Sequence, residues 1–146
     1  MSEWYKDWFD SEEYSDVYAH RDETDAENLL KLIRKNFEFD IGTKVLDAAC
    51  GSGRFSNLFA KEGFDVTSFD LSFPFLRIAK NSSKEDHLNV KYFRSDIRHL
   101  PLKGSFDLVL NMFTSFGYFT TDKENFSFIH SANRLLKDDG IFIFDY

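Results

Sequence analysis

Short apolar runs alternate with segments of helical spacing along most of the chain, and this alternation constrains the fold more than any other feature. The runs predicted as strands are TKVLDAA, FDVTSFD, NVKYFRSD, SFDLVLNMF and IFIFDY. Apolar residues recur at helical spacing over residues 25–37, and further helices are predicted over 52–62, from 72 to about 81, and from 121 to about 137. Alternating strands and helices build βαβ units, so the sequence predicts an α/β fold with a parallel sheet and flanking helices on both faces.

The loop after the first predicted strand is rich in small residues, within VLDAACGSGRF at residues 45–55. In open parallel sheets, ligands bind beyond the carboxyl ends of the strands. Gly51 and Gly53 would let the backbone approach a ligand closely, and the next helix offers unpaired N–H groups. Asp70, at the end of the second predicted strand, can accept both hydroxyls of a ribose. The alternative for Asp70 is a cap on the helix that begins near Ser72.

Two residues around this loop favour a cationic ligand over a dinucleotide. The dinucleotide fingerprint has Gly or Ala three positions after its second glycine, where this chain has Ser56. The first strand also carries an acid, Asp47, shortly before the turn. A carboxylate is unfavourable near a pyrophosphate and favourable near an ammonium or sulfonium group. A nicotinamide-dependent oxidoreductase is therefore the disfavoured alternative.

Together, VLDAACGSGRF, VTSFDLS, FRSDI and FDLVLNMF resemble the class I S-adenosylmethionine-dependent methyltransferases, and FTSFGYF with ANRLLKDDGIFIFD is similar to their small-molecule branch. The resemblance covers residues 25–146. It implies a Rossmann-like, doubly wound, mostly parallel sheet whose five strands take the order 3-2-1-4-5. It further implies S-adenosylmethionine as cofactor and a small-molecule methyl acceptor. Methyl transfer would be an in-line displacement in which the protein aligns donor and acceptor.

The resemblance also implies roles for individual residues. Asp47 would hold the amino group of the methionine moiety, directly or through water. Asp70 would bind the ribose hydroxyls, and Asp96 would accept from the adenine amino group. The other implied cofactor contacts are Ala49, Gly51 and Gly53 in the loop, Leu71 and Ile97 against the adenine, Asn111 and Met112 at the methionine end, and Tyr18 and Arg21 closing over the cofactor. No catalytic residue is assigned, because a general base is needed only if the acceptor must lose a proton.

Three features near these positions carry their own expectations. Ala49 stands where many family members have Gly, and its methyl group is tolerable if φ is negative. Cys50 is expected to be a buried structural thiol rather than a nucleophile. The aromatic loop after the fourth strand either packs under the next helix or walls a pocket for an apolar or aromatic acceptor. Its residues are Met112, Phe113, Phe116, Tyr118 and Phe119.

Two parts are expected along the chain: a helical arm or lid at residues 1–24 and an S-adenosylmethionine-binding domain at residues 25–146, incomplete at its C-terminus. The family sheet usually has seven strands, and this chain supplies five. The strand that begins at Ile141 and ends at Tyr146 would be an open apolar edge, which favours self-association. Either the chain is part of a longer methyltransferase or another chain covers this edge. A non-catalytic cofactor-binding or assembly module is the alternative function.

The composition of the chain limits which binding partners and which cellular location are expected. The net charge of −7 and a pI near 5 argue against non-specific binding of nucleic acid, which needs a basic face. The single cysteine excludes a disulfide framework, and the acidic, aromatic N-terminus does not resemble a signal peptide. No apolar run is long enough for a membrane span, so a cytoplasmic protein without a membrane partner is expected. No metal site is expected from the spacing of the histidines, which are His20, His87, His99 and His130.

Overall fold

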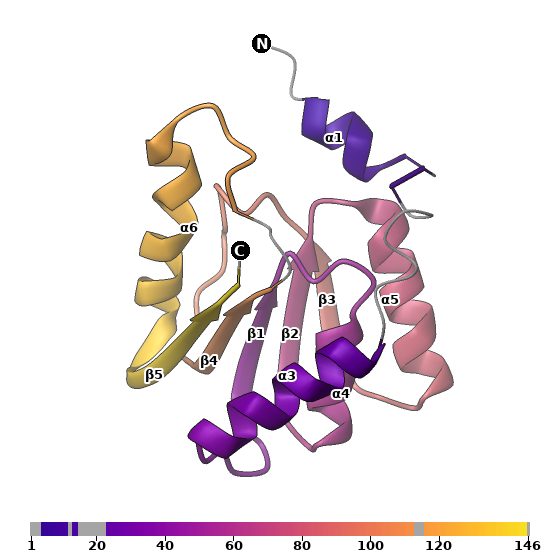
Figure 1. The fold of residues 1–146 in the computed structure, drawn as a ribbon, viewed down its shortest axis with the longest axis vertical. Coiled ribbons are helices and arrows are strands. Elements are labelled where there is room, and N and C mark those ends of the chain that lie inside the picture. Colours follow the sequence, from indigo (N-terminus) through magenta and orange to yellow (C-terminus); the bar gives the residue numbers. More distant parts are fainter. Residues whose placement is uncertain (1–3, 12, 15–22, 113–115, 146) are drawn as a thin grey trace.

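The computed structural model describes residues 4–11, 13–14, 23–112 and 116–145, and these form one parallel sheet flanked by helices (Figure 1). The strands are β1 (Lys44–Ala48), β2 (Asp65–Asp70), β3 (Val90–Arg94), β4 (Phe106–Asn111) and β5 (Leu136–Phe144). The helices are α1 (Trp4–Phe9), α3 (Glu23–Asn36), α4 (Arg54–Lys61), α5 (Phe73–Glu85) and α6 (Asp122–Leu135). The α/β fold predicted from the alternation of strands and helices is therefore confirmed.

The strand order in the sheet is β3-β2-β1-β4-β5, and all neighbouring pairs are parallel, as predicted. Strand β1 is central, and its apolar residues are fully buried, which is typical of a parallel strand covered on both faces. At its carboxyl end, Ala48 pairs with Phe69 of β2 and with Asn111 of β4. The loops that follow these strands therefore leave the sheet at the same edge.

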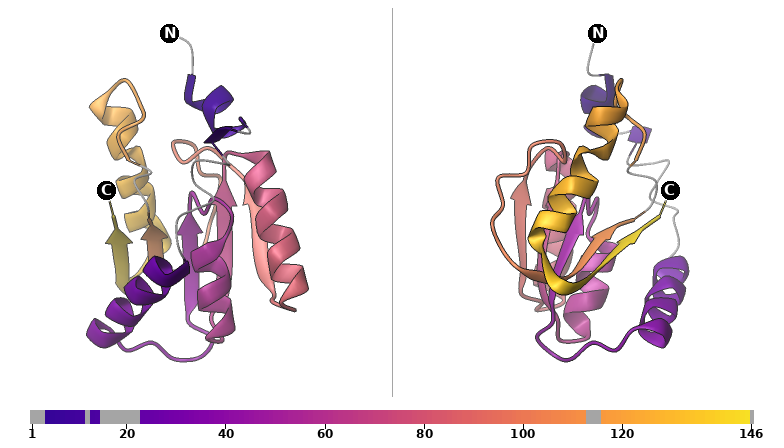
Figure 2. Two further views of the ribbon diagram at one scale, coloured as in Figure 1. Left: turned by 45° about the vertical axis from the view of Figure 1, so that its right-hand side comes forward. Right: turned by 90° about the vertical axis from the view of Figure 1, so that its left-hand side faces the viewer.

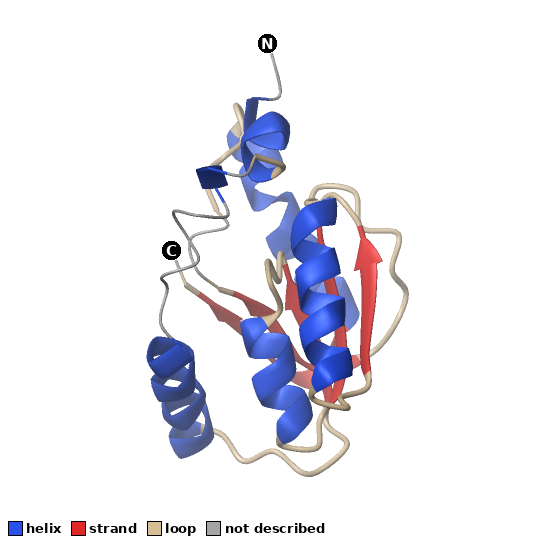
Figure 3. Cartoon of the chain, turned by 90° about the vertical axis from the view of Figure 1, so that its right-hand side faces the viewer, coloured by secondary structure: helices blue, strands red, loops and turns tan. Residues whose placement is uncertain are grey.

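Helices cover both faces of the sheet, so the sheet is doubly wound. Figure 3 shows α3, α4 and α5 side by side on one face, and Figure 2 shows α6 on the other. Because side chains of a strand alternate between faces, Val45 packs with α3 and α4, whereas Leu46 and Ala48 pack with α6. The same alternation sends Asp47 toward α4.

Helix α1 lies beyond the carboxyl ends of the strands (Figure 1). Aromatic rings and one hydrogen bond join it to the rest of the chain among the described contacts. The ring of Tyr5 packs edge-on against Phe119 at 5.4 Å between centroids, and Phe9 packs against Tyr118 at 5.1 Å. The Ser72 hydroxyl, at the start of α5, donates to the Phe9 carbonyl at 3.0 Å. The N-terminal segment is thereby placed over the edge of the sheet where ligands bind in this fold class.

Strand β5 differs from the sequence prediction at its start. A turn was predicted at residues 138–140, and the preceding helix was predicted to reach about Lys137. Instead α6 ends at Leu135, and β5 begins at once and includes residues 138–140. The register shifts between the pairings of Phe106 with Leu136 and of Leu108 with Ile141. The extra residues of β5 are therefore accommodated as an irregularity within the strand rather than as a turn.

The ends of the other elements lie close to their predicted positions. Helix α5 continues to Glu85, beyond its predicted end near residue 81, and the Ser83 hydroxyl on its inner face donates to the Asn57 side chain of α4 at 2.6 Å. Within the described residues, β5 pairs only with β4, and self-association through its outer edge stays a prediction. None of the described helices is long and apolar enough to cross a membrane.

Candidate functional site

A cavity of about 310 Å³ lies at the carboxyl ends of the strands, where the predicted site residues were expected to meet. It is lined by the loops after β1, β2 and β3, by α1, by the first part of α5 and by the loop after β4. The predicted residues that line it are Ala49, Gly51, Asp70, Leu71, Asp96, Ile97 and Met112. The structure therefore brings seven of the twelve predicted cofactor residues to one cavity.

The loop after β1 is held in the left-handed region at Ala49 and Gly51, each with φ of 55°. At Gly51 this conformation is unstrained, and no atom lies within 4 Å of where a Cβ would be. The condition under which the Ala49 methyl group is tolerated, a negative φ, is not met. The Ala49 Cβ crowds the following carbonyl oxygen, which costs about 1 kcal/mol in this conformation.

Gly53 also has a positive φ, of 80°, but it does not line the cavity. A Cβ at this position would lie 2.7 Å from the Tyr92 hydroxyl oxygen and 2.8 Å from the Ala79 Cβ. Gly53 therefore allows the loop to pack against α5 and β3. Its predicted contact with the cofactor stays a prediction, whereas its packing role is visible in the structure.

Asp70 connects two loops at the cavity wall. Its Oδ2 accepts from the Gly51 N–H at 2.8 Å, and its Oδ1 accepts from the Ser72 N–H at 2.8 Å. Ser72 itself caps α5, so Asp70 supports the start of that helix without being its cap. Burial raises the pKa of Asp70, and these two backbone hydrogen bonds oppose the rise. Each carboxylate oxygen has a second lone pair, so the group can still accept two hydroxyls.

Asp47 lies beneath the loop and does not line the cavity. Its side chain is buried on the α4 face, where the Ser56 hydroxyl donates to Oδ2 at 2.6 Å. The Ser68 hydroxyl donates in turn to Ser56 at 2.9 Å. Burial raises the pKa of Asp47 to about 7, the Ser56 bond opposes this rise, and the charge of Asp70 adds to it. The predicted hold of Asp47 on the methionine amino group stays a prediction.

Ser56 is part of the site because it donates this hydrogen bond to Asp47. From the sequence, Ser56 was noted only as a departure from the dinucleotide fingerprint. It is fully buried between Phe55 and Asn57 on the inner side of α4. A hydroxyl at a fully buried helix position needs a partner. A buried serine on this helix and an acid on the strand before it could therefore have predicted the hydrogen bond between Ser56 and Asp47.

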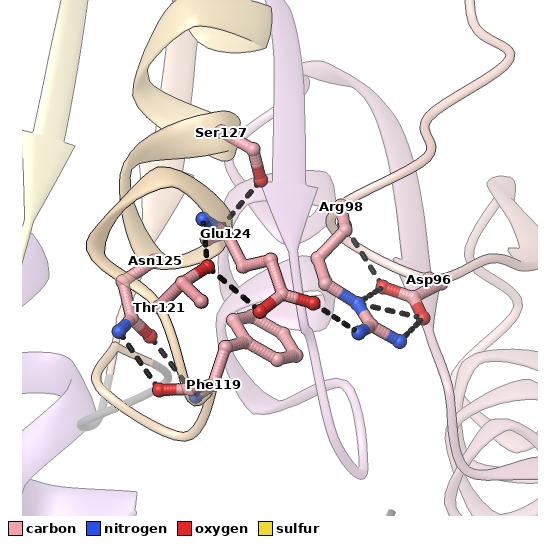
Figure 4. Close-up of polar contacts among 7 residues, drawn as sticks. All are labelled: Asp96, Arg98, Phe119, Thr121, Glu124, Asn125 and Ser127. Atoms are coloured by element: carbon pink, nitrogen blue, oxygen red, sulfur yellow. Dashed lines mark hydrogen bonds and ion pairs between the residues drawn. The ribbon is translucent and has the colours of Figure 1, made fainter.

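Asp96 lines the cavity, and its carboxylate is held by Arg98 (Figure 4). The Arg98 Nη2 donates to Asp96 Oδ2 at 2.7 Å, and the Arg98 backbone N–H donates to Oδ1 at 2.9 Å. Partial burial alone would raise the pKa of Asp96, but the hydrogen bonds and charge of Arg98 outweigh it and lower that pKa. Asp96 is therefore ionised at neutral pH, and its carboxylate oxygens are available only as acceptors. The sequence analysis missed Arg98.

Asn111 and Met112 diverge at the end of β4. Met112 is buried and lines the cavity, whereas Asn111 lines a smaller cavity beside α6 and donates to the Ala48 carbonyl at 3.2 Å. Tyr18 and Arg21 lie outside the described residues. The arm contributes other aromatic residues that the sequence analysis did not single out, and these are Tyr5, Phe9 and Tyr14.

The aromatic loop after β4 divides between its two predicted roles. Phe116 packs against Phe126 of α6 and Phe144 of β5, at 5.4 Å in each case. Tyr118 and Phe119 instead line the cavity. Phe113 lies outside the described residues. Both predicted roles of the loop are therefore found: Phe116 packs against α6 and β5, and Tyr118 and Phe119 form part of the cavity wall.

Cys50 also lines the cavity, but its thiol is unsuited to nucleophilic attack. Burial raises its pKa well above the usual range, and the charges of Asp47 and Asp70 add to the effect. The thiol is therefore protonated at neutral pH, which argues against a nucleophile. Cys50 is half-buried rather than buried as expected, and its structural role stays a prediction. Among the residues that the structure describes, no group of three His, Cys, Asp or Glu side chains could hold a metal ion.

Residues 45–140 match the model of a family described as "Methyltransferase domain", and this span includes the loop after β1, Asp70, Asp96 and Met112. The chain belongs to this family. It is 33% identical over 102 residues to a protein of Geobacillus sp. (strain WCH70) named as a methyltransferase, with 70% of this chain and 41% of the relative covered. The predicted membership of the methyltransferases is thus confirmed.

Two further similarities extend this comparison. The malonyl-[acyl-carrier protein] O-methyltransferase of Pectobacterium atrosepticum is 38% identical over 90 residues, which cover 62% of this chain and 32% of that protein. The crystal structure of an S-adenosylmethionine-dependent methyltransferase from Clostridium acetobutylicum superposes with a TM-score of 0.75 at 24% identity, covering 88% of this chain and 52% of that one. The chain thus spans less than half the length of these two curated relatives.

Proposed function

We propose that this chain forms the S-adenosylmethionine-binding part of a methyltransferase whose methyl acceptor is a small molecule. One observation carries the proposal: in a chain of this family, Asp70 and Asp96 from two strand ends line the same cavity as the Gly51 backbone. The similarity to the Pectobacterium O-methyltransferase and to the Clostridium S-adenosylmethionine-dependent enzyme supports methyl transfer from S-adenosylmethionine.

The cavity suits the chemical parts of S-adenosylmethionine. Asp70 keeps acceptor capacity for the two ribose hydroxyls, and Asp96 is ionised and can accept from the adenine amino group. Leu71 and Ile97 provide apolar surface for the adenine ring. The bound cofactor would supply an electrophilic methyl group on its sulfonium. The protein's task is then to align donor and acceptor and to exclude water.

The N-terminal residues complete this proposal. Residues 1–24 would act as an arm over a binding domain at residues 25–146. Tyr5 and Phe9 of α1 line the cavity together with residues of the β1 loop, which supports this role. Their aromatic rings would help to exclude water from the bound cofactor.

A second candidate is a cofactor-binding module that does not itself transfer methyl groups. A screen of small-molecule acceptors with methyl-labelled S-adenosylmethionine separates the two. Transfer of label by this chain supports the enzyme, and binding without transfer across the screen supports the module.

Equilibrium dialysis with labelled S-adenosylmethionine tests the choice of cofactor. We expect saturable binding that S-adenosylhomocysteine displaces and NAD does not. Asp70→Ala should weaken this binding. Asp65→Ala is its matched control and should not, because Asp65 is an exposed carboxylate at the opposite end of β2 and pairs with Lys91 at 2.7 Å. Displacement by NAD at equal concentration would instead support a nicotinamide enzyme.

A further inference from the structure

We propose that Arg98 is a positioning residue that joins the Asp96 carboxylate to the aromatic arm and so fixes both at the cavity. The inference rests on the proposed function only for the identity of the ligand. It concerns Arg98, which does not line the cavity itself. Arg98 contacts Asp96 and Tyr5, and both of these residues line the cavity.

The guanidinium of Arg98 binds two carboxylates from different parts of the fold (Figure 4). Its Nε donates to both Asp96 oxygens, at 3.1 and 3.2 Å, and its Nη2 donates to Oδ2 at 2.7 Å. Its Nη1 donates to Glu124 Oε1 at 3.0 Å. The Arg98 side chain is only 12% exposed, so these charge-assisted bonds are partly shielded from water. Asp96, which follows β3, is thereby tied to the start of α6.

Glu124 is a rigid anchor for this contact. Thr121 is the N-cap of α6: its hydroxyl accepts from the Glu124 N–H at 3.3 Å and donates to Glu124 Oε2 at 2.8 Å. Asn125 fixes the preceding loop, since its side chain accepts from the Phe119 N–H and donates to the Phe119 carbonyl, both at 3.0 Å. Arg98 and Phe119 are therefore both held against the first turn of α6.

The same guanidinium also lies against two aromatic rings, one from α1 and one from the loop before α6. Its Cζ lies 5.5 Å from the centroid of the Tyr5 ring and 4.6 Å from that of Phe119. Both distances are within the range of cation–π attraction. Tyr5 is the buried residue of α1, at 6% exposure, whereas Trp4 and Trp8 of the same helix are exposed. The contact of Tyr5 with Arg98 and Phe119 is thus central to the placement of α1 over the cavity.

The arrangement requires arginine rather than any cation. A planar fork with five N–H donors can bind two carboxylates and still present its face to a ring, whereas the single ammonium of lysine cannot do all three. Loss of the guanidinium would leave Asp96 without its main partner and α1 without the cation under Tyr5. Helix α1 and the Asp96 carboxylate would then both be held less firmly.

Tryptophan fluorescence can test this directly, because the two tryptophans of the chain, Trp4 and Trp8, both lie in α1. Arg98→Gln should increase quenching by acrylamide without loss of the cooperative melt. It should also weaken S-adenosylhomocysteine binding by about tenfold, the effect of losing one charge-assisted contact. Arg98→Lys should be only a partial rescue. Arg134→Gln, an exposed arginine on α6, is the matched control and should change neither quantity.

Unchanged quenching and unchanged affinity in Arg98→Gln would overturn the proposal. If Arg98→Gln does not fold cooperatively, Tyr5→Leu carries the test and must raise quenching and weaken binding, and failure to do either overturns it. If the wild-type chain binds no S-adenosylhomocysteine, the proposed function fails. The quenching comparison then still decides whether Arg98 holds the arm.

Discussion

The buried acid Asp47 should make the stability of this chain fall as the pH rises. Its carboxylate is 2% exposed, and burial raises its pKa from 3.8 to about 7. In the unfolded chain the group ionises near 4. Between these values the folded state binds a proton that the unfolded state has released, so stability decreases with increasing pH across this window. Replacement by asparagine removes the ionisation and keeps an oxygen that accepts from Ser56.

The size of the effect follows from the pKa difference. Each pH unit between the two pKa values corresponds to about 1.4 kcal/mol, so the advantage of Asp47→Asn over the wild type should grow by about 3 kcal/mol between pH 5 and pH 8. Comparing the two proteins at each pH cancels the contributions of all other groups. The difference in unfolding free energy at any single pH depends on how well the asparagine NH₂ is accommodated. The change of that difference with pH does not depend on this fit.

Urea denaturation of both proteins at pH 5, 6, 7 and 8 measures this change. Asp138→Asn, which removes an exposed carboxylate in β5, controls for the loss of one negative charge. A difference between wild type and Asp47→Asn that is the same at pH 5 and pH 8 would refute the reasoning, because it would mean that Asp47 has an ordinary pKa in the folded chain.

Three further predictions concern the packing of the loop after β1. Ala49→Gly should stabilise the chain by about 1 kcal/mol in urea denaturation, because Ala49 has a φ of 55°; a loss of stability would mean that its Cβ packs favourably. Gly53→Ala should destabilise it by about 2–4 kcal/mol, because the new Cβ would meet Tyr92 and Ala79; a melting temperature equal to that of the wild type would contradict this. Tyr92→Phe should lower the free energy of unfolding by about 1 kcal/mol, because the 2.9 Å contact with Ser83 is lost. Urea denaturation measures this change, and an unchanged free energy would mean that the contact contributes no net stability.

The parallel sheet and the place of the site were predictable because they follow from local patterns. The strand order was predicted only through the resemblance to the methyltransferases. Apolar runs that alternate with helical segments predict a parallel sheet, and Asp70 and Asp96 follow consecutive strands of it. Parallel strands bring such residues to one edge, so their meeting at the cavity needed no knowledge of side-chain contacts.

The side-chain partners were less predictable, for different reasons. The position of Asp47 away from the cavity follows from the two-residue period of β1, which puts it on the face of Val45, and the sequence could have indicated it. The φ of Ala49 is set by how the loop closes over β2, which no local pattern encodes. Arg98 binds Glu124 and Tyr5, distant in sequence in both directions, so its role depends on the folded arrangement.

Calorimetric titration of S-adenosylhomocysteine into the wild-type chain and into Asp70→Ala tests the central claim most directly. The proposed site predicts one-to-one binding to the wild type, weakened by about 1–3 kcal/mol in Asp70→Ala because the ribose hydroxyls lose a charged acceptor. Equal affinity of the two proteins would show that Asp70 serves only the Gly51 and Ser72 amides. No binding at millimolar ligand to a cooperatively folded wild-type sample would contradict the account.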